Sequence, residues 1–271
     1  MAEYSKTLLV YVDIMGFKEL IEKSETHPAS VDTIVETISV LKQQATSGLW
    51  LSSPWVMGAP KAQMRNFSDL IVRARPITPD DNVVMWVNTE LMTLSDIQLQ
   101  LYLTHGIMVR GGMCCGDLFI QDDVIFGPAL VTGYRLGEDL AVYPRIVVDP
   151  AIMDLQPSEK FKTFYLFKDY IKRGDDGVYF VNYLHHLYQP LGNPFDPATP
   201  FEYDINALEL HAEFINTKLN EHSAKPERVK QKAIWLGLYH NSFLTTVMQE
   251  KPSLKERLTA LLIPNDHLKW M

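Results

Sequence analysis

The stretch LLVYVDIMGFKEL (residues 8–20) decides the fold of the N-terminal half of the chain. LLVYV is apolar and rich in β-branched and aromatic residues, as a buried strand is, and MGFKEL continues with helical spacing. Asp13 stands where the strand meets the helix. Burying a carboxylate at the tip of a strand costs free energy unless another group compensates it, so the sequence predicts a partner for Asp13.

Composition and charge limit the class of protein. The chain has 271 residues, 46% of them hydrophobic, which suits one large domain or one domain with an extension. Its formal net charge of −8 argues against a nucleic-acid-binding face, although not against a small anionic ligand. The N-terminal MAEYSK lacks an apolar signal core, no stretch approaches about 18 uninterrupted apolar residues, and the two cysteines are adjacent, so we expect a cytoplasmic protein without a membrane segment.

The hydrophobic pattern predicts an alternation of strands and helices up to residue 150. Strands are expected at 6–13, 63–75, 107–127 (two strands joined at 121–123) and 145–149, and helices at 15–23, 28–47, 78–106 and 128–141. The helix at 28–47 has one apolar stripe, which comprises Val31, Ile34, Ile38 and Leu41. This order predicts an α+β fold, with a mixed or antiparallel sheet and helices on one face.

Beyond residue 150 the pattern is weaker. We expect late strands at 160–170 and 177–188, a proline-rich linker at 190–200, and helices at 203–222, 226–248 and 253–262, while 47–62 reads as a loop. The predicted domains are therefore a catalytic domain over 1–189 and a helical extension over 201–271, which serves packing or dimerisation.

A second aspartate, Asp69, stands in the apolar run NFSDLIV (residues 66–72). A lone aspartate of this kind is typical of a turn or cap, but if the strands of Asp13 and Asp69 are adjacent, their carboxylates converge. Such a pair suits Mg²⁺ or Mn²⁺, which take further oxygen ligands from water and phosphates. The helix that opens at Gly16 and Phe17 directs its free N–H groups to the same place. These residues alone predict metal-dependent phosphoryl or nucleotidyl transfer.

Four motifs in order carry a more specific resemblance: VDIMGFKEL (12–20), FSDLIV (67–72), VRGGMCCGD (109–117) and FGPALVTGYRLGEDLAVYPRIVVD (126–149). Together they resemble the successive motifs of the class III nucleotidyl cyclases, and more closely the pyrimidine cyclases of the Pycsar anti-phage signalling systems. The resemblance covers about residues 5–150. It implies a ferredoxin-like catalytic core with a C-terminal helical extension.

The resemblance also implies a role for each matched residue. Asp13, Asp69 and the carbonyl of Ile14 would hold two divalent cations, Mn²⁺ or Mg²⁺, which bridge the triphosphate and activate the ribose 3′-hydroxyl for attack on the α-phosphorus. Arg135 would stabilise the transition state from the partner subunit of a head-to-tail homodimer. The residues expected to bind the nucleotide are Ile14, Gly16, Phe17, Arg65 and Arg110.

Departures from the purine cyclases concern the base. The adenine-reading lysine of that family is matched here by Arg65, and its adenine-reading aspartate by Val124, next to Asp123, which argues against ATP. A guanidinium can fill the space left by a smaller ring and donate to a pyrimidine carbonyl. Val131 stands where the family has a catalytic asparagine, which weakens the case for turnover unless another donor replaces it.

Other charged residues have two interpretations each. Arg110 lies in an apolar run and requires an acidic partner, which is a phosphate, Asp117 or a helix end. Tyr134 and Glu138 flank Arg135 and belong either to the site or to a subunit interface. Arg145 is expected to form a structural ion pair rather than to meet a phosphate.

The leading hypothesis is a homodimeric cyclase that converts UTP to 3′,5′-cyclic UMP and pyrophosphate. The alternatives are a cytidylate cyclase, a purine cyclase, and a degenerate cyclase fold that binds a nucleotide as a sensor without turnover. The expected partners are a nucleoside triphosphate, a second copy of the chain and a downstream effector that responds to the cyclic nucleotide, with no nucleic acid and no membrane.

Overall fold

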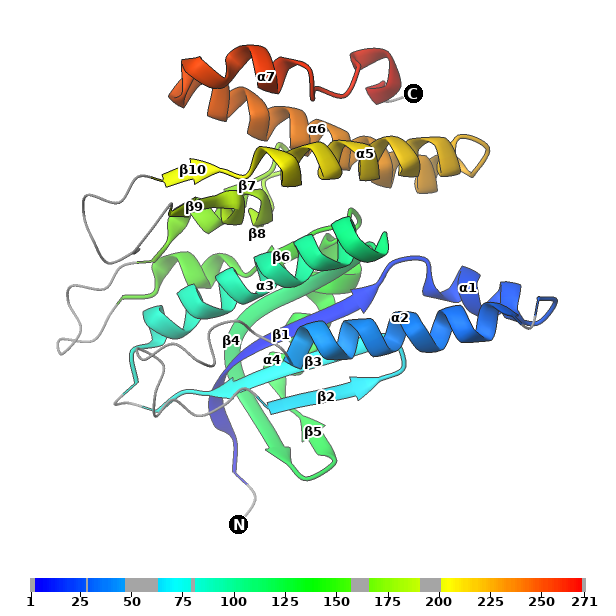
Figure 1. Ribbon diagram of the computed structural model, residues 1–271. Coiled ribbons are helices and arrows are strands. Elements are labelled where there is room, and N and C mark those ends of the chain that lie inside the picture. Colours follow the sequence, from blue (N-terminus) through cyan, green and yellow to red (C-terminus); the bar gives the residue numbers. More distant parts are fainter. Residues whose placement is uncertain are drawn as a thin grey trace. The chain divides into compact units, whose positions relative to one another are not determined.

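The computed structural model describes residues 3–27, 29–46, 63–78, 81–156, 166–190 and 201–269 (Figure 1). The chain forms two compact units: unit 1 is Met1–Leu101 with Ile107–Tyr183, and unit 2 is Tyr102–Gly106 with Leu184–Met271. The predicted loop at 47–62 lies outside the described residues, and so does the predicted linker at 190–200 except for Pro190. In the described part of the chain, no helix combines the length and the apolar character needed to cross a membrane.

Unit 1 is built on a mixed sheet with the strand order β2-β3-β1-β4-β6-β8-β7, in which β5 pairs with β4. The central strand β1 (Ser5–Ile14) is antiparallel to both β3 (Leu70–Pro76) and β4 (Val109–Gln121). β4 pairs in parallel with β6 (Ile146–Val148) and forms a hairpin with β5 (Val124–Phe126). All residues of the apolar run from Leu8 to Val12 are buried, as the sequence predicts. The α+β fold class is confirmed.

The strand predicted at 63–75 is wrong in one respect, because this segment is a hairpin of β2 (Gln63–Phe67) and β3. Ser68 has a φ of 59°, in the left-handed region that tight turns use. Asp69 therefore lies in the turn that precedes β3 rather than inside a strand. Since Asp13 pairs with Leu70, this turn lies at the same sheet edge as the end of β1.

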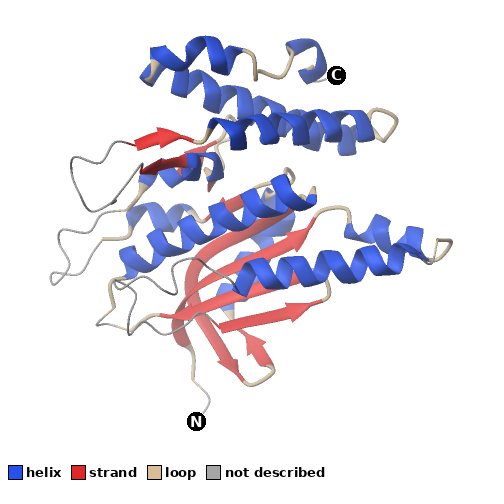
Figure 2. Cartoon of the chain, viewed as in Figure 1, coloured by secondary structure: helices blue, strands red, loops and turns tan. Residues whose placement is uncertain are grey.

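The prediction of helices on one face is wrong in this detail, because helices lie on both faces of the sheet. The long helices α2 (Ala29–Thr46) and α3 (Val83–His105) cover one face, as predicted, and α1 (Phe17–Ser24) follows β1 (Figures 1 and 2). The short helix α4 (Pro128–Arg135) and a π-helical turn, Leu136–Leu140, pack against the other face. Val31 of α2 is exposed, so the predicted apolar stripe of this helix starts one turn later, at Ile34.

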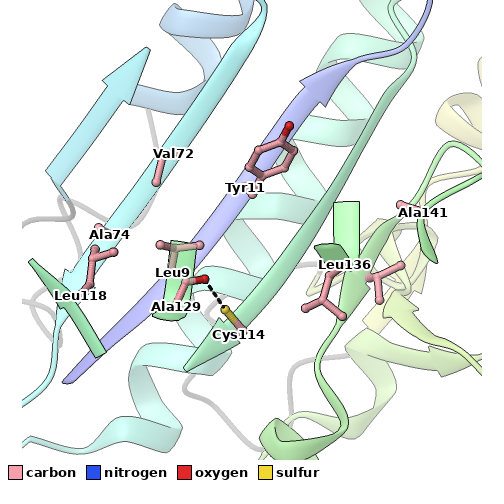
Figure 3. Packing of buried hydrophobic residues seen from close by; sticks show 10 residues of the cluster. Leu9, Tyr11, Val72, Ala74, Cys114, Leu118, Ala129, Leu136 and Ala141 are labelled. Atoms are coloured by element: carbon pink, nitrogen blue, oxygen red, sulfur yellow. Dashed lines mark hydrogen bonds between the residues drawn. The ribbon is translucent and has the colours of Figure 1, made fainter. Parts of the chain in front are cut away.

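Alternation along β3 places its side chains on these two faces. Arg73 donates a hydrogen bond of 2.5 Å to Glu90 of α3, and both residues are buried. The neighbouring Val72 and Ala74 point to the opposite side, where they join the cluster shown in Figure 3. In that cluster the thiol of Cys114 donates to the carbonyl of Ala129 in α4 at 3.3 Å. The packed core thus holds α4 against β1 and β4, beside the strand ends.

The rest of unit 1 extends the sheet. Two 3₁₀ turns, Pro150–Asp154 and Lys168–Tyr170, precede the hairpin of β7 (Ile171–Arg173) and β8 (Tyr179–Val181). The strand predicted at 160–170 is wrong for its described part, 166–170, because β7 begins only at Ile171. Arg145 donates to Asp176 at 2.5 Å and is 1% exposed, which confirms the predicted structural ion pair.

Unit 2 is mainly helical. Its elements are the last residues of the 3₁₀ turn Tyr183–Leu187, the paired strands β9 (Tyr188–Pro190) and β10 (Phe201–Tyr203), the helices α5 (Ile205–His222), α6 (Glu227–Glu250) and α7 (Lys255–Thr259), and the 3₁₀ turns Pro252–Leu254 and Asn265–Leu268. The three predicted C-terminal helices are confirmed, and the last is the shortest.

Candidate metal and nucleotide site

Asp13 is the last residue but one of β1. It lies directly opposite Arg110 of β4 in the antiparallel register. Arg110 donates two hydrogen bonds to Asp13 Oδ2, from Nε at 3.0 Å and from Nη2 at 2.9 Å. The partner that the sequence requires for Asp13 is therefore Arg110. Of the partners proposed for Arg110, Asp117 is wrong, since it is exposed and lies near Lys6 instead, with 3.9 Å between the charged atoms.

The carboxyl groups of Asp13 and Asp69 meet at this sheet edge. Burial and a hydrogen bond between its carboxyl group and that of Asp69 together raise the pKa of Asp13 from 3.8 to about 7, although Arg110 acts in the opposite direction. Asp13 is 9% exposed, so its charge has little access to water. The predicted convergence of the two carboxylates is confirmed, although Asp69 reaches the site from a turn.

Two further side chains complete the network. Arg110 Nη2 also donates to Glu138 Oε1 at 2.6 Å, and the hydroxyl of Tyr11 donates to the same oxygen at 3.3 Å. Of the two alternatives for Glu138, a place in the site or in a subunit interface, the structure favours the site. The sequence reasoning missed Tyr11, although residues two apart in a strand share a face and Tyr11 precedes Asp13 by two.

The turn between β1 and α1 brings a helix N-terminus to the end of β1. Gly16 has a φ of 83°, which L side chains rarely adopt, whereas the space beside it is open. The glycine is therefore required by backbone conformation and not by close approach. Ile14 is the last residue of β1 and is buried, and Phe17 begins α1 and is buried as well.

Arg65 lies on β2, opposite Val72 of β3. Its guanidinium donates to the carbonyl of Met64 at 2.9 Å and to the carbonyl of Asp122 in the β4–β5 turn. The structure thus brings Arg65 next to the hairpin turn that holds Asp123 and Val124, the two positions that the sequence links to base recognition. Val124 is 53% exposed and offers no polar group there.

Arg135, the last residue of α4, is not joined to this network. Its side chain is exposed and makes no hydrogen bond or ion pair with the described residues. Val131, one turn earlier, is exposed as well. α4 thus presents an unpaired guanidinium to solvent.

The donor set fits a hard divalent cation. Among the described residues, no group of three or more His, Cys, Asp or Glu side chains is arranged to hold a metal ion. Mg²⁺, however, is commonly held by one or two carboxylates together with water and substrate phosphates. Asp13 and Asp69 are such a pair, and the carbonyl of Ile14 follows Asp13 directly in the chain.

The chain has distant structural likenesses among known proteins. No protein-family model matches this chain, and no curated protein matches it. The chain is similar to the adenylyl cyclase CyaB from P. aeruginosa, with 15% identity over 67% of this chain and 95% of that chain and a TM-score of 0.46. It is also similar to an adenylate/guanylate cyclase/hydrolase from Silicibacter pomeroyi, with 18% identity over 66% of this chain and 96% of that chain and a TM-score of 0.36. Both TM-scores are below 0.5, so the function proposed below rests on the residues of this chain.

Proposed function

We propose that this protein is a nucleotidyl cyclase of the class III type, which converts UTP to 3′,5′-cyclic UMP and pyrophosphate. The observation that carries the proposal is the meeting of Asp13 and Asp69 at one sheet edge, beside Arg110 and the start of α1. This combination suits a metal-bound triphosphate, because the two carboxylates can bind the metal ions while the guanidinium and the helix N-terminus can bind the phosphates.

In the proposed reaction, the ribose 3′-oxygen bonds to the α-phosphorus, the bond from that phosphorus to pyrophosphate breaks, and the hydroxyl proton leaves to solvent. Asp13, Asp69 and the Ile14 carbonyl hold two divalent cations, Mn²⁺ or Mg²⁺, and these supply charge neutralisation and a more acidic 3′-hydroxyl. Arg110, freed in part from Asp13, binds a phosphate oxygen. The N–H groups of the first turn of α1, after Gly16 and Phe17, bind phosphate as well.

The catalytic unit that we propose is a head-to-tail homodimer. Arg135 is exposed and unpaired within the described part of the chain, which supports a role on a second copy. There its guanidinium stabilises the charge that develops on the equatorial phosphate oxygens. The catalytic domain spans 1–189, and the extension over 201–271 serves packing or dimerisation.

The choice of UTP rests on Arg65 and on the resemblance of the motifs to pyrimidine cyclases. Arg65 lies against the β4–β5 turn, where the purine cyclases pair a lysine with an aspartate. CTP is the alternative substrate. The product would be a second messenger for a downstream effector in anti-phage defence.

One observation favours a second candidate function. Val131 offers no donor at the position of the catalytic asparagine, which is what a nucleotide-binding sensor without turnover would tolerate. The two functions are separated by incubating the purified full chain with Mn²⁺ or Mg²⁺ and each of the four ribonucleoside triphosphates, and identifying products by mass spectrometry. We expect cyclic UMP, abolished by excess chelator. Nucleotide binding without any cyclic product would overturn the cyclase and support the sensor.

A further inference from the structure

Glu138 reaches the site because of the unusual turn that carries it. The π-helical turn Leu136–Leu140 follows α4 directly, and π-helical turns are rare and occur frequently at functional sites. A Cβ atom on Gly137 would lie 2.8 Å from Cδ1 and 2.9 Å from Cε1 of the Tyr11 ring, so only glycine lets this turn lie on Tyr11. The turn thereby brings Glu138 to the face of β1 that bears Tyr11 and Asp13.

Four side chains then form one connected series. Tyr11 and Arg110 both donate to Glu138 Oε1, at 3.3 and 2.6 Å, and Arg110 donates twice to Asp13 Oδ2. Tyr11 is 5% exposed and packs edge-on against the ring of Tyr134, with 5.7 Å between the ring centroids. This packing restricts the position of the Tyr11 hydroxyl. Both bonds from Arg110 go to Oδ2, which leaves Oδ1 of Asp13 without a bond from Arg110.

The charges of the series explain why two acids share one arginine. A cation that binds Asp13 repels the guanidinium of Arg110, because the two carry like charge. With Asp13 as its only partner, Arg110 would then leave the site, since a long side chain gains rotamer freedom in solvent. Glu138 supplies a second carboxylate at the shorter distance, 2.6 Å against 2.9 Å, and keeps the guanidinium in place.

We infer that Glu138 is a positioning residue, which acts through Arg110 to orient the carboxylate of Asp13 and to retain Arg110 when a divalent cation is bound. This inference rests on the proposed function for its biological meaning. Its geometric content, that Glu138 orders Arg110, holds in the metal-free protein and is measurable without turnover.

The test compares Glu138→Gln, Glu138→Asp and the matched control Asp139→Asn. Asp139 is exposed, lies in the same π-helical turn and forms no hydrogen bond or ion pair through its side chain with the other described residues. The first readout is the ¹⁵N–¹H signal of Arg110 Nε in the metal-free full chain, assigned with Arg110→Lys. We expect Glu138→Gln to lose the slow exchange of this proton, Glu138→Asp to retain part of it, and Asp139→Asn to match the wild type.

The second readout is Mn²⁺ affinity, measured from the paramagnetic resonance of free Mn²⁺. Loss of a group that orients a metal ligand weakens metal binding by about 10- to 100-fold, so we expect that loss for Glu138→Gln and none for Asp139→Asn. A wild-type protein that makes no cyclic nucleotide would overturn the proposed function alone. An unchanged Arg110 Nε signal in Glu138→Gln would overturn the inference, whatever the activity.

Discussion

Arg110 faces Asp13 across the β1–β4 pair and binds its carboxylate with two hydrogen bonds, of 3.0 and 2.9 Å. Although the guanidinium of Arg110 lowers the pKa of Asp13, burial and the neighbouring Asp69 raise it to about 7 overall. One guanidinium therefore does not offset the combined effect of burial and of the neighbouring Asp69 on this carboxyl group. A divalent cation would do so, which gives the site a measurable dependence on pH and metal.

Without metal, the free energy of unfolding should carry the signature of Asp13. The folded protein binds the proton of Asp13 more tightly than the unfolded chain does, since its pKa is about 7 against an ordinary value of 3.8. Asp13 therefore lowers stability progressively as pH rises from about 4 to about 7. As pH rises over that range, we expect the Tm of the wild type to fall relative to the Tm of Asp13→Asn. The measurement is thermal denaturation of both proteins at several pH values with chelator present.

Metal should reverse this effect. Adding Mn²⁺ above pH 7 is expected to raise the Tm of the wild type and not that of Asp13→Asn, because a ligand that binds only the folded state stabilises it. Asp139→Asn serves as the control and should respond as the wild type does. Equal shifts in wild type and Asp13→Asn would show that Mn²⁺ binds elsewhere.

The elements around Asp13 were predictable because their signals are local. The apolar run before Asp13, the proline at the start of α4 and the polar turn at 122–123 each fix a boundary through nearby residues, and β1, α4 and the β4–β5 hairpin follow. The turn at Ser68 has a weaker signal, since Ser68 and Asp69 are turn-forming residues but neither glycine nor proline occurs in NFSDL and the positive φ falls on serine. The pattern therefore predicts one long strand where the chain forms a hairpin.

The partners within the site depend on the register between β1 and β4, which are far apart in the chain and are joined by no hairpin turn that would indicate it. Asp13 meets Arg110 because β1 and β4 pair with these residues opposite each other, and that alignment results from packing over the whole sheet. Glu138 depends on a π-helical turn that ordinary helical spacing cannot indicate. The convergence of Asp13 and Asp69 was foreseen only because adjacency of their strands was assumed.

Arg135 is expected to act on the site of a second copy. Asp69→Ala and Arg135→Ala should each be inactive alone, the first through loss of a metal ligand and the second through loss of a transition-state contact of the kind worth about 10²- to 10³-fold in kcat. Mixed chains should regain activity, because a heterodimer has one site with both residues intact. The measurement is cyclic nucleotide formation after subunit exchange, and a chain that stays monomeric in solution would contradict the composite site.

Unit 2 contains a buried histidine pair with the opposite pH dependence. Nδ1 of His211 and Nδ1 of His240 are 3.0 Å apart, and Nε2 of His240 lies 3.2 Å from the Leu261 carbonyl. Burial lowers the pKa of His240 from 6.5 to about 4 and that of His211 well below its usual range, so the unfolded chain takes up more protons. The stability of the native protein should therefore fall as pH decreases from about 6.5 to 4.

The check for the histidine pair is the unfolding free energy of His240→Gln, measured against the wild type at each pH so that the contribution of Asp13 cancels. We expect the acid-induced loss to be smaller in this variant. His267→Gln is the control, because His267 is exposed and should leave the pH profile unchanged. Parallel profiles for wild type and His240→Gln would show that the pair is not the acid-sensitive element.

Base selection is expected to depend on Arg65. Its planar guanidinium bonds to two carbonyls at once, those of Met64 and Asp122, and so is held at the β4–β5 turn with part of its surface exposed. A lysine in its place is a point charge with fewer fixed directions and less bulk, so it would hold the turn less firmly and leave more room for a larger ring. The present arginine should therefore favour a pyrimidine and disfavour a purine.

The prediction is that the wild type cyclises UTP, or failing that CTP, far better than ATP or GTP, since polar groups left unpaired by the wrong base discriminate by as much as ~10⁴. Arg65→Lys should reduce this preference by more than it reduces total metal-dependent turnover, because the hydrogen bonds of Arg65 go to Met64 and Asp122 rather than to Asp13 or Asp69. Competition assays that give kcat/KM for UTP and ATP in one mixture measure the ratio directly. Arg257→Lys, an exposed arginine of unit 2, is the matched control and should keep the wild-type ratio. Efficient cyclisation of ATP by the unmodified chain would mean that Arg65 does not exclude purines, and an unchanged ratio in Arg65→Lys would assign base selection to other residues.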